Sequence, residues 1–261
     1  MTSTPGGPVE GQRPVEAVIF DWGGTLTPWH TIDLREQWLH YSEVYDPEHA
    51  DELSARILSE EDAAWRAGRD HQRSATIEQI FAAVGVDVTT DLHADALAAY
   101  HRWWEPHTHT DPDVPGLLTG LRERGIRVGV LSNTLWTRDY HEEVFRRDGV
   151  LDLIDGAVYS SEIPWTKPHP EAFRAAMAAV GASDPARCVF VGDRLFDDVW
   201  GAKSVGMRAV YLPHSVIPTA QRGHTDGEPD AVVQRLAEIV PLVDAWRAAA
   251  KRPEPASRSG R

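Results

Sequence analysis

Four polar side chains stand at or after the ends of short apolar runs, where they could act together on one ligand. With the runs that they end or follow, they are Asp21 (AVIFD), Ser132 (VGVLS), Lys167 (beyond AVYS) and Asp193 (CVFVGD). Ligands of open parallel sheets bind at the carboxyl ends of the strands, so these side chains are expected to converge on one rim. A pair of carboxylates suits a divalent cation, most simply Mg²⁺. A hydroxyl, an ammonium and loop N–H groups suit the oxygens of a phosphoryl group.

The apolar runs that must position these side chains are short, rich in β-branched residues and bounded by glycine or polar residues. Such runs are typical of buried parallel strands. Strands are predicted over residues 17–21, 128–132, 157–160, 188–193, 209–212 and 231–233. Amphipathic stretches between them predict helices at about 117–124, 138–147, 170–180, 197–205 and 237–249. The alternation indicates an α/β fold with a doubly wound parallel sheet.

One interval interrupts this alternation. Residues 27–113 hold no convincing strand run, and their pattern predicts helices over 33–45, 47–68, 76–84 and 91–104. Suitable N-caps for these helices are Asp33, Asp46 and either Thr90 or Asp91. An all-helical insertion after the first strand is typical of a cap over the site. The expected division is an α/β core over 14–27 and 114–250, with a helical cap over 28–113.

Composition narrows the class of protein. The 261 residues carry 40 Asp and Glu against 26 Lys and Arg, a net charge of −14, which argues against nucleic acid and anionic membranes as partners. The single Cys188 excludes an internal disulfide and a multi-thiolate metal site. No membrane span or signal peptide is visible, so a cytoplasmic protein is expected. Residues 1–13 and 251–261 are expected to be disordered tails.

The motifs as a set resemble the haloacid dehalogenase (HAD) superfamily. Four segments carry the resemblance in order, namely DWGGTLT from Asp21, SNT from Ser132, KP from Lys167 and GDRLFDD from Gly192. The stretch from about Pro14 to Arg247 fits that fold. The resemblance implies a Rossmann-like core with an α-helical cap of the type inserted after the first strand.

The resemblance also implies roles for single residues. Asp21 would be the nucleophile that takes a phosphoryl group as an aspartyl phosphate, and Lys167 would neutralise charge beside it. Mg²⁺ would be held by Asp21, the backbone carbonyl of Gly23, Asp193 and Asp198, with Asp197 as the alternative to Asp198. The residues expected near the phosphoryl group are Ser132, Asn133 and Thr25. The implied activity is Mg²⁺-dependent hydrolysis of a small phosphorylated metabolite.

Gly23 departs from the family pattern. HAD phosphatases usually carry a second Asp two residues after the nucleophile, which protonates the leaving oxygen and then activates water. Glycine moves no proton, and general acid–base help is typically worth about 10²–10⁴ in rate. A substrate with a good leaving group would need no such help. A base from elsewhere, such as His30 or His169, could replace it, or the protein could be a weakly active phosphate-binding protein.

Two other activities need no acid at position 23. Dehalogenation releases halide, but HAD dehalogenases generally lack the metal-binding pattern that GDRLFDD retains. Phosphonoacetaldehyde hydrolysis would require a cap lysine, and residues 28–113 contain none.

Three tryptophans lie close to the motifs. Trp22 follows the nucleophile and is expected to border the site, and Trp136 and Trp165 are candidates to line the cleft. A substrate that touches all three would present an apolar or ring-shaped group. The sequence leaves the substrate's identity and the choice between monomer and homodimer open.

Overall fold

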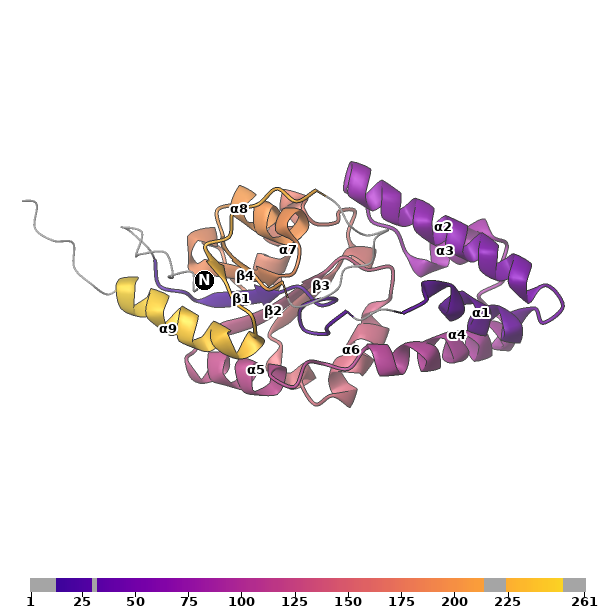
Figure 1. Cartoon of the computed structure of the whole chain (residues 1–261), viewed down its shortest axis with the longest axis horizontal. Helices are drawn as coiled ribbons and strands as arrows, with labels where there is room; N and C mark the ends of the chain where they lie inside the picture. Colours follow the sequence, from indigo (N-terminus) through magenta and orange to yellow (C-terminus); the bar gives the residue numbers. More distant parts are fainter. Residues whose placement is uncertain (1–12, 30–31, 214–223, 251–261) are drawn as a thin grey trace, which may run out of the picture.

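The structure is a computed structural model that describes residues 13–29, 32–213 and 224–250. Except for Arg13, both predicted tails lie outside these ranges. The centre of the molecule is a six-stranded sheet in the order β3-β2-β1-β4-β5-β6, in which every pair is parallel (Figure 1). Its strands are β1 (Ala17–Phe20), β2 (Arg127–Ser132), β3 (Gly156–Tyr159), β4 (Cys188–Gly192), β5 (Arg208–Tyr211) and β6 (Ala231–Val232). The predicted doubly wound α/β fold is therefore confirmed.

Alternating side chains of the central strands pack on opposite faces of this sheet, as the two-residue period of a strand requires. Val18 and Phe20 of β1 join one hydrophobic cluster, and Ala17 and Ile19 join the other. The first cluster includes residues of α5 (Val114–Glu123), α6 (Arg138–Arg147) and α9 (Ile239–Ala250), and the second includes residues of α7 (Pro170–Ala179) and α8 (Gly201–Ser204). The sheet is thus covered by helices on both faces (Figure 1).

The register of the central strands brings their polar ends to one edge. Phe20 of β1 pairs with Val130 of β2 and with Val191 of β4. Asp21, Ser132 and Asp193 follow within two residues of these positions, so all three lie at the carboxyl edge of the sheet.

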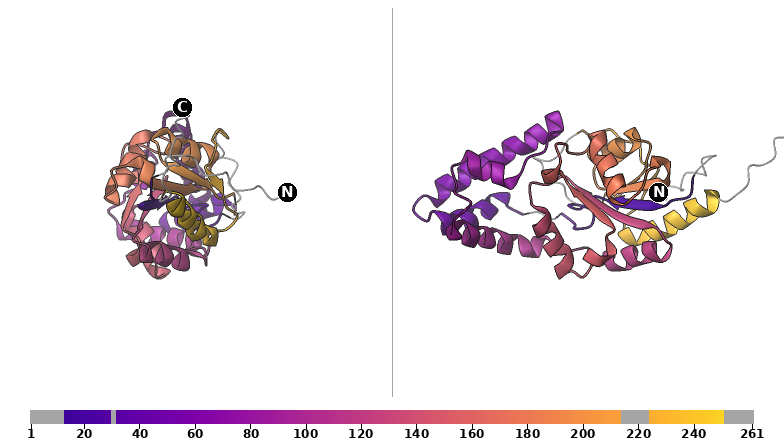
Figure 2. Two further views of the ribbon diagram at one scale, coloured as in Figure 1. Left: turned by 90° about the vertical axis from the view of Figure 1, so that its left-hand side faces the viewer. Right: turned by 180° about the vertical axis from the view of Figure 1, so that it is seen from behind.

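Four helices between β1 and β2 form a separate group at one end of the molecule, opposite α9 (Figures 1 and 2). We call this group the helical insert: α1 (Leu34–Tyr45), α2 (Ala50–His71), α3 (Ile77–Ala83) and α4 (Asp91–Trp104). Its own core is aromatic, with Trp38 stacked on Tyr100 at 4.6 Å and Tyr41 on Phe81 at 4.9 Å between ring centroids. No helix of the described residues is long and apolar enough to cross a membrane.

One local prediction was wrong, and one predicted helix has an unexpected form. Asp46 was expected to cap α2 but instead ends α1, because Pro47 holds the residue before it out of the helical region and α2 begins only at Ala50. The helix expected at 197–205 begins as a π-helix over Leu195–Trp200 and becomes α-helical at Gly201. Single π-turns often occur at functional sites. Asp33 and Thr90 do cap their helices, as predicted.

Candidate active site

The loop after β1 holds Asp21 against the carboxylate of Asp193. Gly24 has a φ of +98°, and a Cβ at this position would lie 2.1 Å from Asp193 Oδ2. Glycine is therefore required both for the backbone conformation and for the close approach. Thr25, which is completely buried, donates a hydrogen bond from Oγ1 to Asp21 Oδ2 at 3.3 Å. Thr25 thus contacts the nucleophile candidate directly.

Lys167 joins two of the carboxylates. Its Nζ lies 2.5 Å from Asp21 Oδ1 and 2.7 Å from Asp198 Oδ1, and its side chain is 3% exposed. Burial alone would lower the pKa of Lys167, but the charges of Asp198 and Asp21 outweigh it and raise that pKa above its ordinary value. Lys167 is therefore a permanent cation between two acids.

Asn133 positions this lysine. Its amide Nδ2 donates to the carbonyl of Lys167 at 3.1 Å, and its Oδ1 accepts from the Lys167 backbone N–H at 2.7 Å. The Asn133 side chain lines the cavity but uses both of its polar atoms on Lys167. The neighbouring Ser132 is different, because its buried Oγ has no hydrogen-bond partner among the described residues. Ser132 is thus the member of this pair with a hydroxyl available to a ligand.

Three buried carboxylates, those of Asp21, Asp193 and Asp198, offer oxygens that all lie within 4.8 Å of one another. Neither oxygen of Asp193 has a hydrogen-bond partner among the described residues. Burial raises the pKa of Asp193 well above its usual range, Arg194 opposes the rise, and the charges of Asp21 and Asp198 add to it. An oxygen-only donor set with an unsatisfied buried carboxylate fits a hard divalent cation.

In the turn after β4, the side chains of Asp198 and Asp197 contact different partners. Asp198 Oδ2 accepts from the backbone N–H of Arg194 at 2.9 Å, and Asp198 is completely buried. Asp197 instead lies 3.5 Å from the Arg194 guanidinium and lines the cavity. Of the two candidates at the end of GDRLFDD, the structure therefore places Asp198 in the acidic group.

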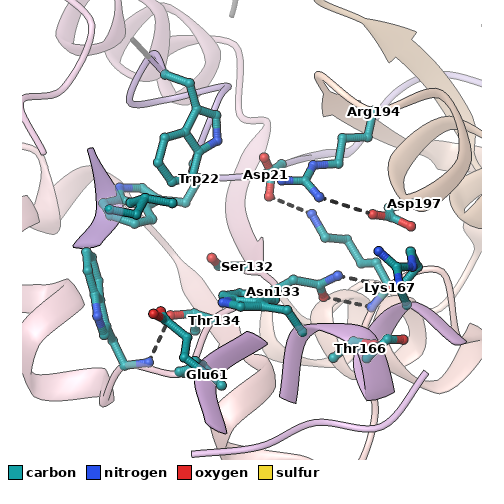
Figure 3. Close-up of a pocket in the computed structure, with 18 of the residues that line it drawn as sticks. Asp21, Trp22, Glu61, Ser132, Asn133, Thr134, Thr166, Lys167, Arg194 and Asp197 are labelled. Atoms are coloured by element: carbon teal, nitrogen blue, oxygen red, sulfur yellow. Dashed lines mark hydrogen bonds and ion pairs between the residues drawn. The ribbon is translucent and has the colours of Figure 1, made fainter. Parts of the chain in front are cut away.

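A cavity of about 260 Å³ extends from Asp21 of this acidic group to the helical insert (Figure 3). The sheet side contributes Asp21, Trp22, Gly23, Ser132 and Lys167, so most of the predicted site residues meet there. The insert contributes residues that the motifs did not identify, namely Leu58, Glu61, Trp65, Tyr100 and Trp104.

Glu61 is the acid that sequence reasoning missed. Its Oε2 accepts hydrogen bonds from Trp38 Nε1 at 2.6 Å and Gln37 Nε2 at 3.0 Å. Burial raises the pKa of Glu61 to about 7, although hydrogen bonds from Trp38 and Trp65 oppose the rise. One signal was present in the sequence: Glu61 lies between Leu58 and Trp65 at helical spacing, which places an acid on an apolar stripe.

Of the other candidate residues near the motifs, some line the cavity and others do not. Trp136 lines the cavity, whereas Trp165 is not among the lining residues and stacks on His169 at 3.9 Å between ring centroids. His169 accepts a hydrogen bond at Nδ1 from the Glu171 backbone and so caps α7. His30 lies outside the described residues.

Comparisons with known proteins identify the family. A family model for haloacid dehalogenase-like hydrolases matches residues 15–206. The chain is similar to glyceraldehyde 3-phosphate phosphatase of Methanopyrus kandleri, with 27% identity over 88% of this chain and 97% of that protein. It is also similar to ribulose-1,5-bisphosphate 5-phosphatase of Halopiger xanaduensis, with 26% identity over 87% of this chain and 98% of that protein.

Solved structures show the same fold. A HAD phosphatase from Thermococcus onnurineus matches with a TM-score of 0.61 and 26% identity, over 88% of this chain and 98% of that one. An L-2-haloacid dehalogenase from Xanthobacter autotrophicus matches with a TM-score of 0.57 and 21% identity over the same shares, a likeness of fold alone. The family model spans most of the chain and the four predicted motif segments, and the chain therefore belongs to the haloacid dehalogenase-like hydrolases.

Proposed function

We propose that this protein hydrolyses a small phosphorylated metabolite, with Asp21 as the nucleophile and Mg²⁺ as the cofactor. The observation that carries the proposal is the position of Asp21, which is held by Lys167 at 2.5 Å beside the unsatisfied carboxylate of Asp193. The relatives named above act on phosphate esters, which supports the same chemistry here.

In the first step, a carboxylate oxygen of Asp21 attacks phosphorus, and the bond from phosphorus to the ester oxygen breaks. The alcohol leaves with a proton from solvent, and an aspartyl phosphate remains. In the second step, water attacks phosphorus, gives up a proton to solvent, and Asp21 is regenerated with release of phosphate. Lys167 neutralises the charge on Asp21, and the Ser132 hydroxyl donates to a phosphoryl oxygen.

The residues that would hold Mg²⁺ are Asp21, Asp193, Asp198 and the backbone carbonyl of Gly23. When bound, the cation would act as a Lewis acid that neutralises charge on the phosphoryl oxygens. In this arrangement Asn133 and Thr25 are positioning residues, because they hydrogen-bond Lys167 and Asp21.

Gly23 decides which substrates react quickly. Because position 23 supplies no proton, esters with good leaving groups are expected to react faster than simple alkyl phosphates. The backbone does not demand glycine here: Gly23 lacks the positive φ of Gly24, and a Cβ would first meet Trp29 Cζ2 at 3.4 Å. The missing acid is therefore a difference in chemistry that a side chain could restore.

The proposed organisation is a core over 14–27 and 114–250 with a helical cap over 28–113 that opens for the substrate and closes to exclude water. Such a cover favours a small molecule over nucleic acid or a membrane surface. The predicted cytoplasmic location, and a monomer or homodimer, belong to the same proposal.

The test is initial phosphate release from p-nitrophenyl phosphate, acetyl phosphate and several sugar and nucleotide phosphates, with Mg²⁺ or with EDTA. 2-Chloropropionate is included as the dehalogenase substrate. Release that requires both Mg²⁺ and Asp21 is expected, with Asp21→Asn as the control. Halide release that is indifferent to EDTA would overturn the proposal.

A second candidate is a weakly active protein that binds Mg²⁺ and phosphate, which the absence of an acid at Gly23 favours. Inorganic phosphate would then bind in the presence of Mg²⁺, as calorimetry would show, while every ester remained intact.

A further inference from the structure

The two ends of the cavity differ in chemistry. The sheet end is charged, with Asp21 and Lys167, whereas the insert end is largely aromatic, with Trp65, Tyr100 and Trp104. Trp22 and Trp136 extend this aromatic wall from the core side. The hydroxyls of a short polyhydroxylated ester would find few hydrogen-bond partners among these rings, so the wall suits a different group on the alcohol.

Glu61 places a carboxylate in this wall. Its hydrogen-bond partners are neutral donors, the indoles of Trp38 and Trp65 and the amide of Gln37. Among the described residues Glu61 forms no ion pair, and the adjacent Asp62 adds a second negative charge. A partly buried carboxylate without a cation is costly, and a cation supplied by a ligand would offset part of that cost.

The other charges on this side do not supply that cation. Leu58, Glu61 and Trp65 share one face of α2 by their spacing of three and four residues. Arg69, the arginine of α2 that lines the cavity, forms an ion pair with Asp70 at 3.1 Å. The helical insert therefore lines the cavity with a carboxylate and several aromatic rings. Proteins use this combination to bind ammonium and quaternary ammonium groups.

We propose that the substrate is a phosphomonoester whose alcohol carries a cationic nitrogen, which binds at Glu61 within the aromatic wall. This inference rests on the proposed function, because it places the phosphoryl group at Asp21 and Lys167. The pKa of Glu61, raised by burial to about 7, supports it, since a neighbouring cation would return that pKa toward its ordinary value.

The first test compares two esters of equal shape. Phosphocholine carries a quaternary nitrogen, and 3,3-dimethylbutyl phosphate has carbon in its place. We expect wild-type protein to favour phosphocholine in kcat/KM by about tenfold or more. Glu61→Gln should remove most of that preference, since the amide accepts the same hydrogen bonds but bears no charge. Glu60→Gln, an exposed neighbour on α2, should retain it.

A binding measurement separates this inference from the proposed function. Calorimetry with choline alone should show binding to wild-type and Asp21→Asn proteins and a loss of affinity of about tenfold in Glu61→Gln. If no ester is hydrolysed but choline binds in this way, the proposed function fails, and only the cation-binding site at Glu61 stands. If phosphate is released with equal preference for both esters and choline does not bind, the inference is overturned and the proposed function stands.

Trp65→Leu provides a second variant, whose folding does not depend on replacing the Glu61 carboxylate. It should reduce the preference for phosphocholine several-fold, because it removes one ring of the wall and one hydrogen bond to Glu61. If a folded Trp65→Leu protein kept the wild-type ratio of kcat/KM values for the two esters, binding of the cation by aromatic rings would be contradicted.

Discussion

The carboxyl edge of the sheet and the helical insert build opposite halves of one cavity by different means. At the edge, Asp21, Ser132 and Asp193 follow buried strands, and Lys167 forms ion pairs with both Asp21 and Asp198. On the insert, Glu61 and Trp65 project from one helix, and the hydrogen bonds to Glu61 come from neutral donors. From this difference we propose that the sheet edge supports the reaction, whereas the insert supports the choice of substrate.

The largest effect on activity is expected from a substitution at the carboxyl edge of the sheet. Asp21→Asn removes the proposed nucleophile, and a loss of phosphate release on the order of 10⁴-fold is expected with any ester. Steady-state kinetics with p-nitrophenyl phosphate measures it, with thermal unfolding as the control for folding. Residual activity close to wild type would mean that another group attacks phosphorus.

Lys167→Met tests the network of charges through stability. It leaves the buried carboxylates of Asp21 and Asp198 without their cation, and the free energy of unfolding should fall by about 3–5 kcal/mol. The measurement is urea unfolding in EDTA. Lys203→Met is the matched control, because Lys203 pairs with Asp230 in a more exposed position and should contribute at most about 1 kcal/mol. Equal losses in the two variants would contradict a special role for Lys167.

The Gly23→Asp variant tests whether an acid at position 23 is the only group that the site at the sheet edge lacks. Turnover of alkyl phosphates should rise by about 10²-fold, with little change for acetyl phosphate, because the acyl group leaves without a proton. Gly23→Ala fills the same space without an acid and should show no gain. A gain in both variants would point to loop geometry as its cause.

The smallest expected effect is the contribution of Glu61 to the pH dependence of the free energy of unfolding. Its folded pKa of about 7 exceeds its ordinary value of 4.5, so the folded state binds more protons between these pH values. Wild-type stability should therefore fall relative to Glu61→Gln as pH rises from about 4.5 to about 7, by about 1–3 kcal/mol. The neighbours Asp62 and Tyr100 face the same carboxylate, and Glu60→Gln is the control. Parallel stability curves for wild type and Glu61→Gln would show that the insert does not desolvate this acid.

Much of the fold followed from the sequence because its strands are short buried runs and its helices have clear apolar faces. The predicted helix at 138–147 coincides with α6, and the predicted strands lie within one residue of β1, β2 and β3. Their ends place Asp21, Ser132 and Asp193 by the rule that parallel strands share a carboxyl edge. The motifs at these ends were sufficient to predict the family.

Tertiary structure alone decided which side chains share the cavity, since this depends on how each helix is rotated and where each side chain points. It turned Asp198 toward Lys167 and Asp197 toward Arg194, although the two acids are adjacent in the chain. It directed the Asn133 amide to the backbone of Lys167 and placed Glu61 opposite the motifs. Sequence spacing defines the face of a helix, but only the packing of α2 over the sheet edge determines what that face meets.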